Sequence, residues 1–297
     1  MSNLDTVVLA DDYATVRSAA ERFVEELHAT INREGIELPS LPEIALRIRR
    51  ALADNSIEVD GLTHLIGSDP ALAARLLRTA NCALFKRGAG PVRDLRTAIM
   101  RLGYKMVRSV SISLAAQQVF LGYATKPIRP YLKEVWKHSI QVGTLAYLLA
   151  RYSDAVENEE AFLAGLLHEV GKLYILIRAK DHPELFRNEA AFNAIVADWQ
   201  AELGRAITRS WDFSDELSTA IGEHGSCSLR CGPQASLTEV VAVANLLAER
   251  IGTQIDNDEA LCELPNFGSL NLDPQTLAWV IAVSADEVHA LQDAIGI

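Results

Sequence analysis

The sequence has few cysteines and no long hydrophobic run. The four cysteines, Cys82, Cys227, Cys231 and Cys262, are scattered over 297 residues. This spacing excludes a disulfide scaffold and favours a reducing cytoplasm. The longest uncharged segment, 109–125, contains three serines and two glutamines and is too short to span a bilayer. No basic stretch followed by an apolar one opens the chain, so we expect no signal peptide and no membrane partner.

Basic residues are outnumbered by acidic ones, which gives a formal net charge of −11. This negative excess argues against a general nucleic-acid binder. Positive charge is nevertheless concentrated in residues 75–108, which contain nine lysines and arginines and one acidic residue, Asp94. This stretch is a candidate contact for phosphates or an acidic partner. The alternative is a solvated helix face that pairs with the acidic remainder of the chain.

Apolar residues recur at three- and four-residue spacing along most of the chain, and no alternating strand pattern is present. We therefore predict an all-α fold. Asp69-Pro70 and Asp273-Pro274 are typical of helix starts, and Ser40 with Glu43 and Ser284 with Glu287 match capping boxes. Prolines in 122–130 indicate a break between two helical parts. The predicted helices cover 14–31, 42–53, 70–84, 103–121, 132–151, 160–177, 189–211 and 236–251.

The chemistry-bearing residues are histidines. His138 lies within an amphipathic helix, and His168-Glu169 follows an apolar one and precedes Gly171-Lys172. Adjacent histidine and carboxylate ligands can hold one divalent ion together with a histidine from another helix. Lys172 could then hold a phosphate oxygen. The alternative is a buried hydrogen-bonded network in which Lys172 pairs with Glu169 one helical turn away.

A second arrangement, His224-x-x-Cys227-x-x-x-Cys231, could bind zinc. Zinc sites usually combine two closely spaced pairs of ligands, and no second pair is near. A loop with two free thiols is the preferred interpretation.

The histidine pattern resembles the HD superfamily of metal-dependent phosphohydrolases, and the preceding motifs are similar to the HDOD (HD-related output) domain of bacterial signalling proteins. The resemblance implies an HD-like helical bundle in two sub-bundles over 38–250, divided into 38–125 and 126–250. A leader helix in 1–37 and C-terminal helices in 251–297 would flank it. The motifs are Leu38-Pro39-Ser40-Leu41-Pro42, Gly67-Ser68-Asp69-Pro70-Ala71-Leu72, Leu76-Leu77-Arg78-Thr79-Ala80-Asn81 and Ala98-Ile99-Met100-Arg101-Leu102-Gly103.

Two departures from the family's metal site weaken the case for hydrolysis. Glu169 replaces the usual aspartate and is longer by one carbon–carbon bond of about 1.5 Å. Asn245 aligns with the distant aspartate, so the formal charge of the ligands falls from −2 to −1. The resemblance then leaves His138, His168 and Glu169 as metal ligands, with His224 or Asn245 as further candidates. We expect no firmly held cofactor, and the alternative is a divalent Mn, Mg, Fe or Zn ion.

These observations favour a non-catalytic, cytoplasmic signal-transduction output protein. It would act by binding a signalling protein partner, with a small nucleotide-like ligand as a second kind of partner. The alternative function is a metal-dependent phosphohydrolase of a nucleotide or cyclic dinucleotide, in which Lys172 steadies the phosphate. A nucleic-acid-binding regulator would depend only on the basic stretch 75–108.

Overall fold

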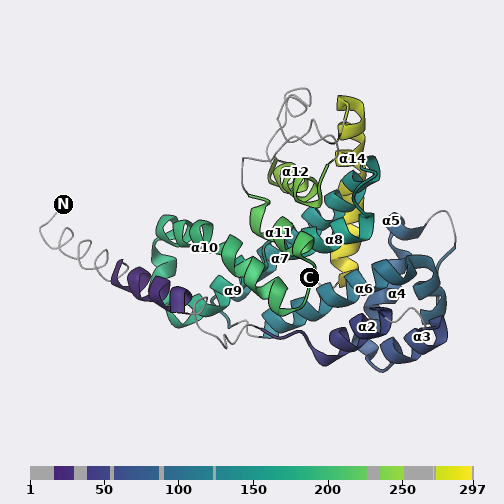
Figure 1. Cartoon of the computed structure of the whole chain (residues 1–297), viewed down its shortest axis with the longest axis horizontal. Coiled ribbons are helices and arrows are strands. Elements are labelled where there is room, and N and C mark those ends of the chain that lie inside the picture. The colour runs from purple at the N-terminus through teal and green to yellow at the C-terminus, as the bar shows by residue number, and fades with distance from the viewer. Residues whose placement is uncertain are drawn as a thin grey trace, which may run out of the picture.

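The fold is all-α, as the sequence predicts. The computed structural model describes residues 17–29, 39–53, 57–86, 90–122, 125–225, 235–250, 270 and 272–295, and these contain helices and connecting segments but no strand (Figure 1). Within these ranges, no helix combines the length and the low polarity that a membrane crossing requires.

The first group of helices lies around α6. This element carries a kink at Gly103, whose φ of 76° is left-handed and favours glycine. The kink divides it into two helical segments. The second begins at the kink, where the sequence predicts a helix start at 103, whereas the sequence does not predict the first segment, which begins at Leu95. The helices of this group are α2 (Glu43–Ala53), α3 (Val59–Gly67), α4 (Pro70–Asn81), α5 (Ala83–Lys86) and α6 (Leu95–Gly122).

The second group of helices follows the proline-containing segment after α6. The prediction of one helix over 160–177 is wrong, because two helices meet at His168-Glu169. Glu169 has φ −98° and ψ 18°, which is outside helical geometry. The elements are α7 (Arg129–Leu149), η1 (Ala150–Tyr152), α8 (Asn158–Leu167), α9 (Val170–Arg178), η2 (Ala179–Asp181), η3 (Pro183–Arg187), α10 (Glu189–Ser210), α11 (Asp215–Glu223) and α12 (Leu237–Arg250).

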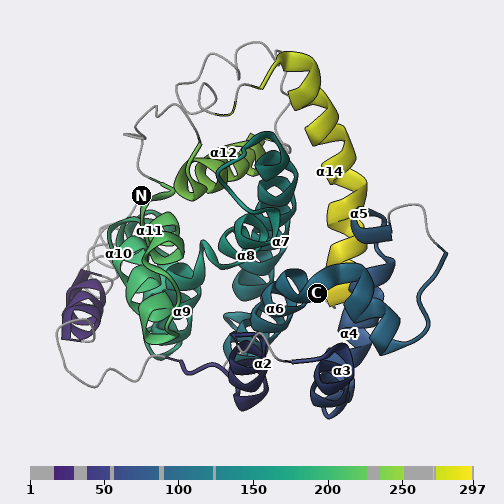
Figure 2. The ribbon, with the colours of Figure 1, turned by 45° about the vertical axis from the view of Figure 1, so that its right-hand side comes forward.

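Helix α14 (Pro274–Ile295) joins the two groups. It runs beside α4 and α5 of the first group and packs against α7 of the second (Figure 2). Arg78 donates from Nε to the carbonyl of Ala294 at 3.0 Å. The carboxylate of Glu287, which is 7% exposed, accepts from the backbone N–H of Leu84 at 2.6 Å.

Two of the four predicted helix starts are confirmed. The start at Ser40 is misplaced, because α2 begins at Glu43 and its first bonds run to the carbonyl of Pro42, and the start at Ser284 is wrong. Asp69 accepts from the N–H groups of the second and third residues of its helix, and Asp273 accepts from that of Thr276. Ser284 and Glu287 do not form a capping box, because both lie inside α14. Ser284 donates to a carbonyl of the preceding turn, and Glu287 is engaged by α5.

Replacing Asp69 with alanine should lower the free energy of unfolding by about 1 kcal/mol. The substitution leaves the N–H groups of Ala71 and Leu72 without the carboxylate oxygen that accepts from both at 3.0 Å. Urea denaturation followed by circular dichroism measures the change. Asp69→Asn, which keeps an acceptor, should recover most of the loss, and an equal loss in both variants would argue against a capping role.

Glycines allow two pairs of helices in the second group to approach closely, α8 with α7 and α9 with α10. A Cβ on Gly165 of α8 would lie 2.7 Å from the Cα of Gly143 in α7. A Cβ on Gly171 of α9 would lie within 2.9 Å of three backbone atoms of α10. The break between α8 and α9 is therefore held against α7 on one side and α10 on the other, which fixes the position of His168 and Glu169.

Candidate functional site

The histidines that the sequence singles out come together where four elements meet. His138 projects from α7, and His168 and Glu169 form the break between α8 and α9. His224 follows the last residue of α11, and Asn245 lies in α12. The ring centroids of His138 and His168 are 5.2 Å apart, and those of His168 and His224 are 4.9 Å apart.

One ring nitrogen of His168 keeps an available lone pair at the place where these elements meet. Its Nδ1 lies 2.7 Å from the carbonyl oxygen of Gly165. Because a carbonyl oxygen only accepts, Nδ1 carries the proton and Nε2 carries the lone pair. Nε2 is buried and has no hydrogen-bond partner among the described residues. A backbone carbonyl that fixes the tautomer in this way is typical of metal-binding histidines.

Burial keeps the two inner histidines neutral. Desolvation, followed by the neighbouring rings of His224 and His138, lowers the pKa of His168 well below its ordinary value of 6.5. Desolvation also lowers the pKa of His224, whose Nδ1 donates to the carbonyl of Ile221 at 2.8 Å. Both rings are therefore neutral near pH 7, the state in which imidazole can bind a metal.

Asn245, which aligns with the family's distant aspartate, is part of a hydrogen-bonded chain. His138 Nε2 lies 2.8 Å from Asn245 Oδ1, and Asn245 Nδ2 donates to Glu249 Oε1 at 3.0 Å. Since the amide donates to a carboxylate, its oxygen faces the histidine, and His138 donates from Nε2. The Nε2 proton of His138 must therefore leave, or move to Nδ1, before Nε2 can bind a cation.

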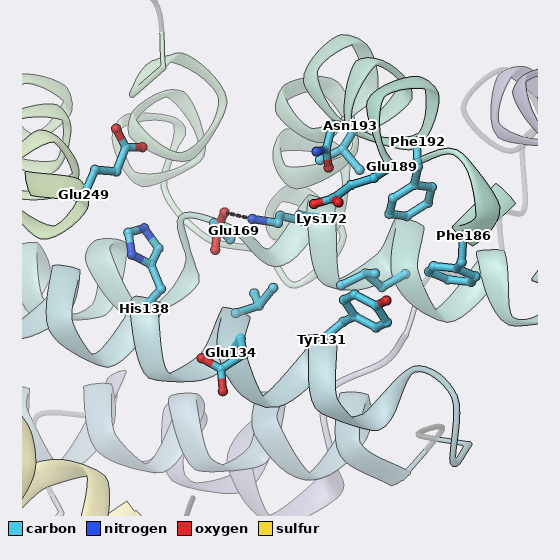
Figure 3. A pocket seen from close by; sticks show the side chains of 13 residues that line it. Tyr131, Glu134, His138, Glu169, Lys172, Phe186, Glu189, Phe192, Asn193 and Glu249 are labelled. Carbon is cyan, nitrogen blue, oxygen red and sulfur yellow. Dashed lines mark hydrogen bonds and ion pairs between the residues drawn. The ribbon is translucent and has the colours of Figure 1, made fainter. Parts of the chain in front are cut away.

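Glu169 is paired as the second interpretation of the sequence expects. Lys172 Nζ donates to Glu169 Oε1 at 2.6 Å (Figure 3). The glutamate is 8% exposed, and its other oxygen, Oε2, is buried without a partner among the described residues. Lys172 therefore balances the charge of Glu169 but satisfies only one of its two oxygens.

The donor set fits a divalent cation with one anionic ligand. His138, His168 and Glu169 each offer an atom, and these atoms lie within 4.8 Å of one another. The buried and unpartnered His168 Nε2 and Glu169 Oε2 are the two atoms that a cation would satisfy. Asn245 can add an amide oxygen but no charge. The assignment of these residues as metal ligands stays a prediction.

A cavity of about 570 Å³ opens beside Glu169 (Figure 3). Most of its lining was not predicted from the sequence, although Tyr131 and Glu134 precede His138 by seven and four residues and share its face of α7. The lining residues from η3 and α10 share no such spacing with a residue that the sequence singles out. The cavity is lined by Tyr131, Glu134, Val135, His138, Glu169, Lys172, Leu176, Phe186, Glu189, Phe192, Asn193, Val196 and Glu249.

The basic stretch 75–108 makes many internal contacts. Five of its nine basic side chains contact other residues of the first group of helices, α14 or Glu157, and are therefore engaged within the molecule. The contacts join Arg75 to Gln117, Arg78 to Ala294, Arg96 to Asp60, Arg101 to Ala80 and Gly90, and Lys105 to Glu157.

The rival zinc site is not placed, because Cys227 and Cys231 lie outside the described residues. Cys82 is described and buried. Burial, followed by the charge of Glu287, raises the pKa of its thiol to about 12. Cys82 is therefore protonated near pH 7 and unsuited to metal binding.

The two neutral histidines predict a loss of stability in acid. The unfolded chain binds protons below about pH 6.5, whereas the folded chain takes them up only at lower pH. The free energy of unfolding of chelator-treated protein should fall by up to about 1.4 kcal/mol per pH unit per histidine below that point. Chemical denaturation at pH 7.5, 6.5 and 5.5 measures this slope.

The variant His168→Gln should have a flatter slope, and the control variant His289→Gln, at an exposed position, should not. Equal slopes in the parent and both variants would contradict the lowered pKa of His168.

Comparisons with known proteins identify the family. The model of the HDOD domain matches residues 38–227. An uncharacterized protein of Treponema pallidum (strain Nichols) is 25% identical over 259 residues, or 81% of this chain and 49% of that protein. The chain therefore spans about half the length of this curated relative.

Solved structures agree with this match. A crystal structure from Shewanella amazonensis SB2B, named "Putative metal-dependent phosphohydrolase", is 26% identical with a TM-score of 0.79, over 94% of this chain and 99% of that chain. An HDOD domain protein with unknown function from Geobacter sulfurreducens is 22% identical with a TM-score of 0.72, over 95% and 100% of the two chains, and shows the same fold. Since the family model covers more than half of the sequence, the chain belongs to the HDOD family.

Proposed function

We propose that this chain is a regulatory output domain that acts by binding and does not hydrolyse phosphoesters. Membership of the HDOD family fits a regulatory output domain. The family's histidines are in place, but the residues around them are engaged with one another. The proposal places the binding event at the cavity beside Glu169, with a signalling protein as the downstream partner in the cytoplasm.

The observation that carries this proposal is the hydrogen-bonded chain through Asn245. The amide is held by His138 at 2.8 Å and by Glu249 at 3.0 Å. It supplies no negative charge to a cation, so Glu169 is the one anionic ligand of the set. Hydrolysis requires a metal that lowers the pKa of its bound water toward 7. Two imidazoles, one lysine-paired carboxylate and an amide hold such an ion less firmly than a site with a second carboxylate would.

Metal content and phosphodiesterase activity test the proposal together. Purified protein should be dialysed against chelator, incubated with Mn²⁺, Mg²⁺, Fe²⁺ or Zn²⁺, desalted and analysed by mass spectrometry for metals. Bis(p-nitrophenyl) phosphate and a cyclic dinucleotide serve as substrates. We expect less than one metal per chain after desalting and no turnover above the His168→Ala variant. Stoichiometric metal with turnover that this variant abolishes would overturn the proposal.

The alternative function, a metal-dependent phosphohydrolase, is favoured by one observation. His168 Nε2 and Glu169 Oε2 are buried without partners among the described residues, and a divalent ion would satisfy both. In that case His138, His168 and Glu169 would hold the ion. Such an ion would supply Lewis-acid chemistry, and Lys172 would steady a phosphate oxygen of a nucleotide or cyclic dinucleotide.

A further inference from the structure

One end of the cavity beside Glu169 is built from aromatic rings. Tyr131 of α7 stacks on Phe186 of η3, with ring centroids 5.5 Å apart and planes inclined by 24°. Phe186 in turn contacts Phe192 of α10 at 5.1 Å between centroids. Tyr131 is 51% exposed. This end of the cavity therefore offers aromatic surface at its opening.

The charged groups of the same cavity are mostly negative. Four glutamates line it against the single Lys172, which gives a formal charge of −3 for the lining. Lys172 already pairs with Glu169. Glu134 pairs with Lys137, which lies outside the lining. Glu189, at the start of α10, has no ion pair with any described residue and lies near Phe192 and Lys172 in Figure 3.

A buried acceptor lies at the inner end. Glu169 is 8% exposed, and the oxygen that Lys172 does not bind has no partner among the described residues. In Figure 3 this oxygen points away from Lys172, toward the space between His138 and Glu134. An unpaired carboxylate oxygen in a buried position is costly unless a donor reaches it. The cavity therefore has a place for a hydrogen-bond donor at its inner end.

We propose that this cavity binds a small organic cation, namely an amine or guanidinium attached to an apolar body. The cationic nitrogen would donate to Glu169 Oε2, and the body would contact the rings of Tyr131 and Phe186. The carboxylates attract the cation, and the aromatic rings cover its apolar body. A volume of about 570 Å³ fits small-molecule sites of roughly 300–1,000 Å³. The inference deepens the proposed function, on which it rests, by naming the ligand class.

The same features disfavour the other ligand classes. A nucleotide-like ligand would bring phosphate charge against four glutamates, and the one lysine is already paired with a carboxylate. A bare divalent ion would use Glu169 and the histidines but leave the aromatic rings without a role. A neutral apolar molecule would leave the buried Glu169 oxygen unsatisfied. An organic cation uses both ends of the cavity.

Three probes that share a phenylethyl skeleton separate charge from shape: phenethylamine, 2-phenylethanol and 3-phenylpropionate. Calorimetry and saturation-transfer NMR should be done on chelator-treated protein, with adenosine monophosphate as the nucleotide arm. We expect phenethylamine to bind at least about tenfold more tightly than 3-phenylpropionate. Equal binding of the three probes, or tighter binding of either anion, would overturn the proposal.

Variants locate the site. Glu189→Gln should weaken phenethylamine binding about threefold, and Phe186→Leu about fivefold. Glu202→Gln provides the matched control, because Glu202 is also an exposed residue of α10 but does not line the cavity. An equal loss in Glu202→Gln, or none in Glu189→Gln, would overturn the assignment to this cavity.

The outcome is separable from that of the proposed function. Metal-dependent turnover would overturn the non-catalytic role while leaving the preference for cationic probes intact. A preference for anionic probes without turnover would overturn the ligand class and leave the non-catalytic role standing.

Discussion

Replacing Gly171 with alanine should destabilise the protein by about 3 kcal/mol or more. A Cβ at this position would lie 2.0 Å from the carbonyl oxygen of Gln200 and 2.8 Å from the backbone nitrogen of Gly204. These are backbone atoms of α10, so no side chain can rotate away, and α9 and α10 must separate. Guanidinium denaturation followed by circular dichroism measures the loss. A change below about 1 kcal/mol would show that the two helices are not held at this distance.

Gly61→Ala is the matched control for this experiment. Gly61 is an exposed residue of α3, and its added Cβ would meet only Ile57 Cγ1, at 3.6 Å. Alanine is a better helix former than glycine by about 1 kcal/mol. This variant should therefore be as stable as the parent or slightly more so. The contrast between the two glycines separates helix propensity from helix–helix distance.

Asn245→Asp should raise the affinity for Mn²⁺ roughly 10- to 100-fold, the range typical of changes around a metal site. The substitution restores a second anionic ligand beside His138, whose Nε2 already lies 2.8 Å from Asn245 Oδ1. It also places two carboxylates together, because Asn245 now donates to Glu249. A bound cation relieves that repulsion, which increases the gain. Calorimetric titration of chelator-treated protein measures the affinity.

Asn193→Asp is the control: it adds the same charge to the lining of the cavity beside Glu169, away from His138 and His168. It should change Mn²⁺ affinity by no more than about threefold, since an exposed charge contributes little through water. An equal gain in both variants would mean that general electrostatics, and not ligation at residue 245, controls metal binding. No gain in Asn245→Asp would contradict a metal site between His138 and His168.

Local sequence patterns predicted most of the helices, and their failures have physical causes. Helices α3 and α11 were missed because each has nine residues, too few for a repeating apolar pattern, and α3 contains Gly61. The end of a helix at His168 was predicted, but the range 160–177 did not separate the next helix from it, because buried apolar residues continue on both sides of Glu169. Periodicity reports burial and does not reveal a change of helix direction.

The site was only partly predictable for a related reason. His138, His168 and Glu169 could be found because family motifs fix their spacing. Asn81, another motif residue, had no assigned role from sequence. It donates to the carbonyl of Leu77 one turn earlier, but its two other bonds join the backbone of Val92, eleven residues away. Phe186 and Glu189 had no local signal at all, because their place beside Glu169 depends on how α10 packs against α9 and η3.

The attachment of α14 has a consequence for biosynthesis. The bond from Arg78 to the carbonyl of Ala294 spans 216 residues, and the neighbouring contacts of Cys82 and Leu84 span more than 200. At a synthesis rate of about 5–20 residues per second, α4 and α5 emerge roughly 10 to 40 s before the helix that covers them. The apolar face of the first helical group thus remains open to chaperones, or to aggregation, until α14 emerges.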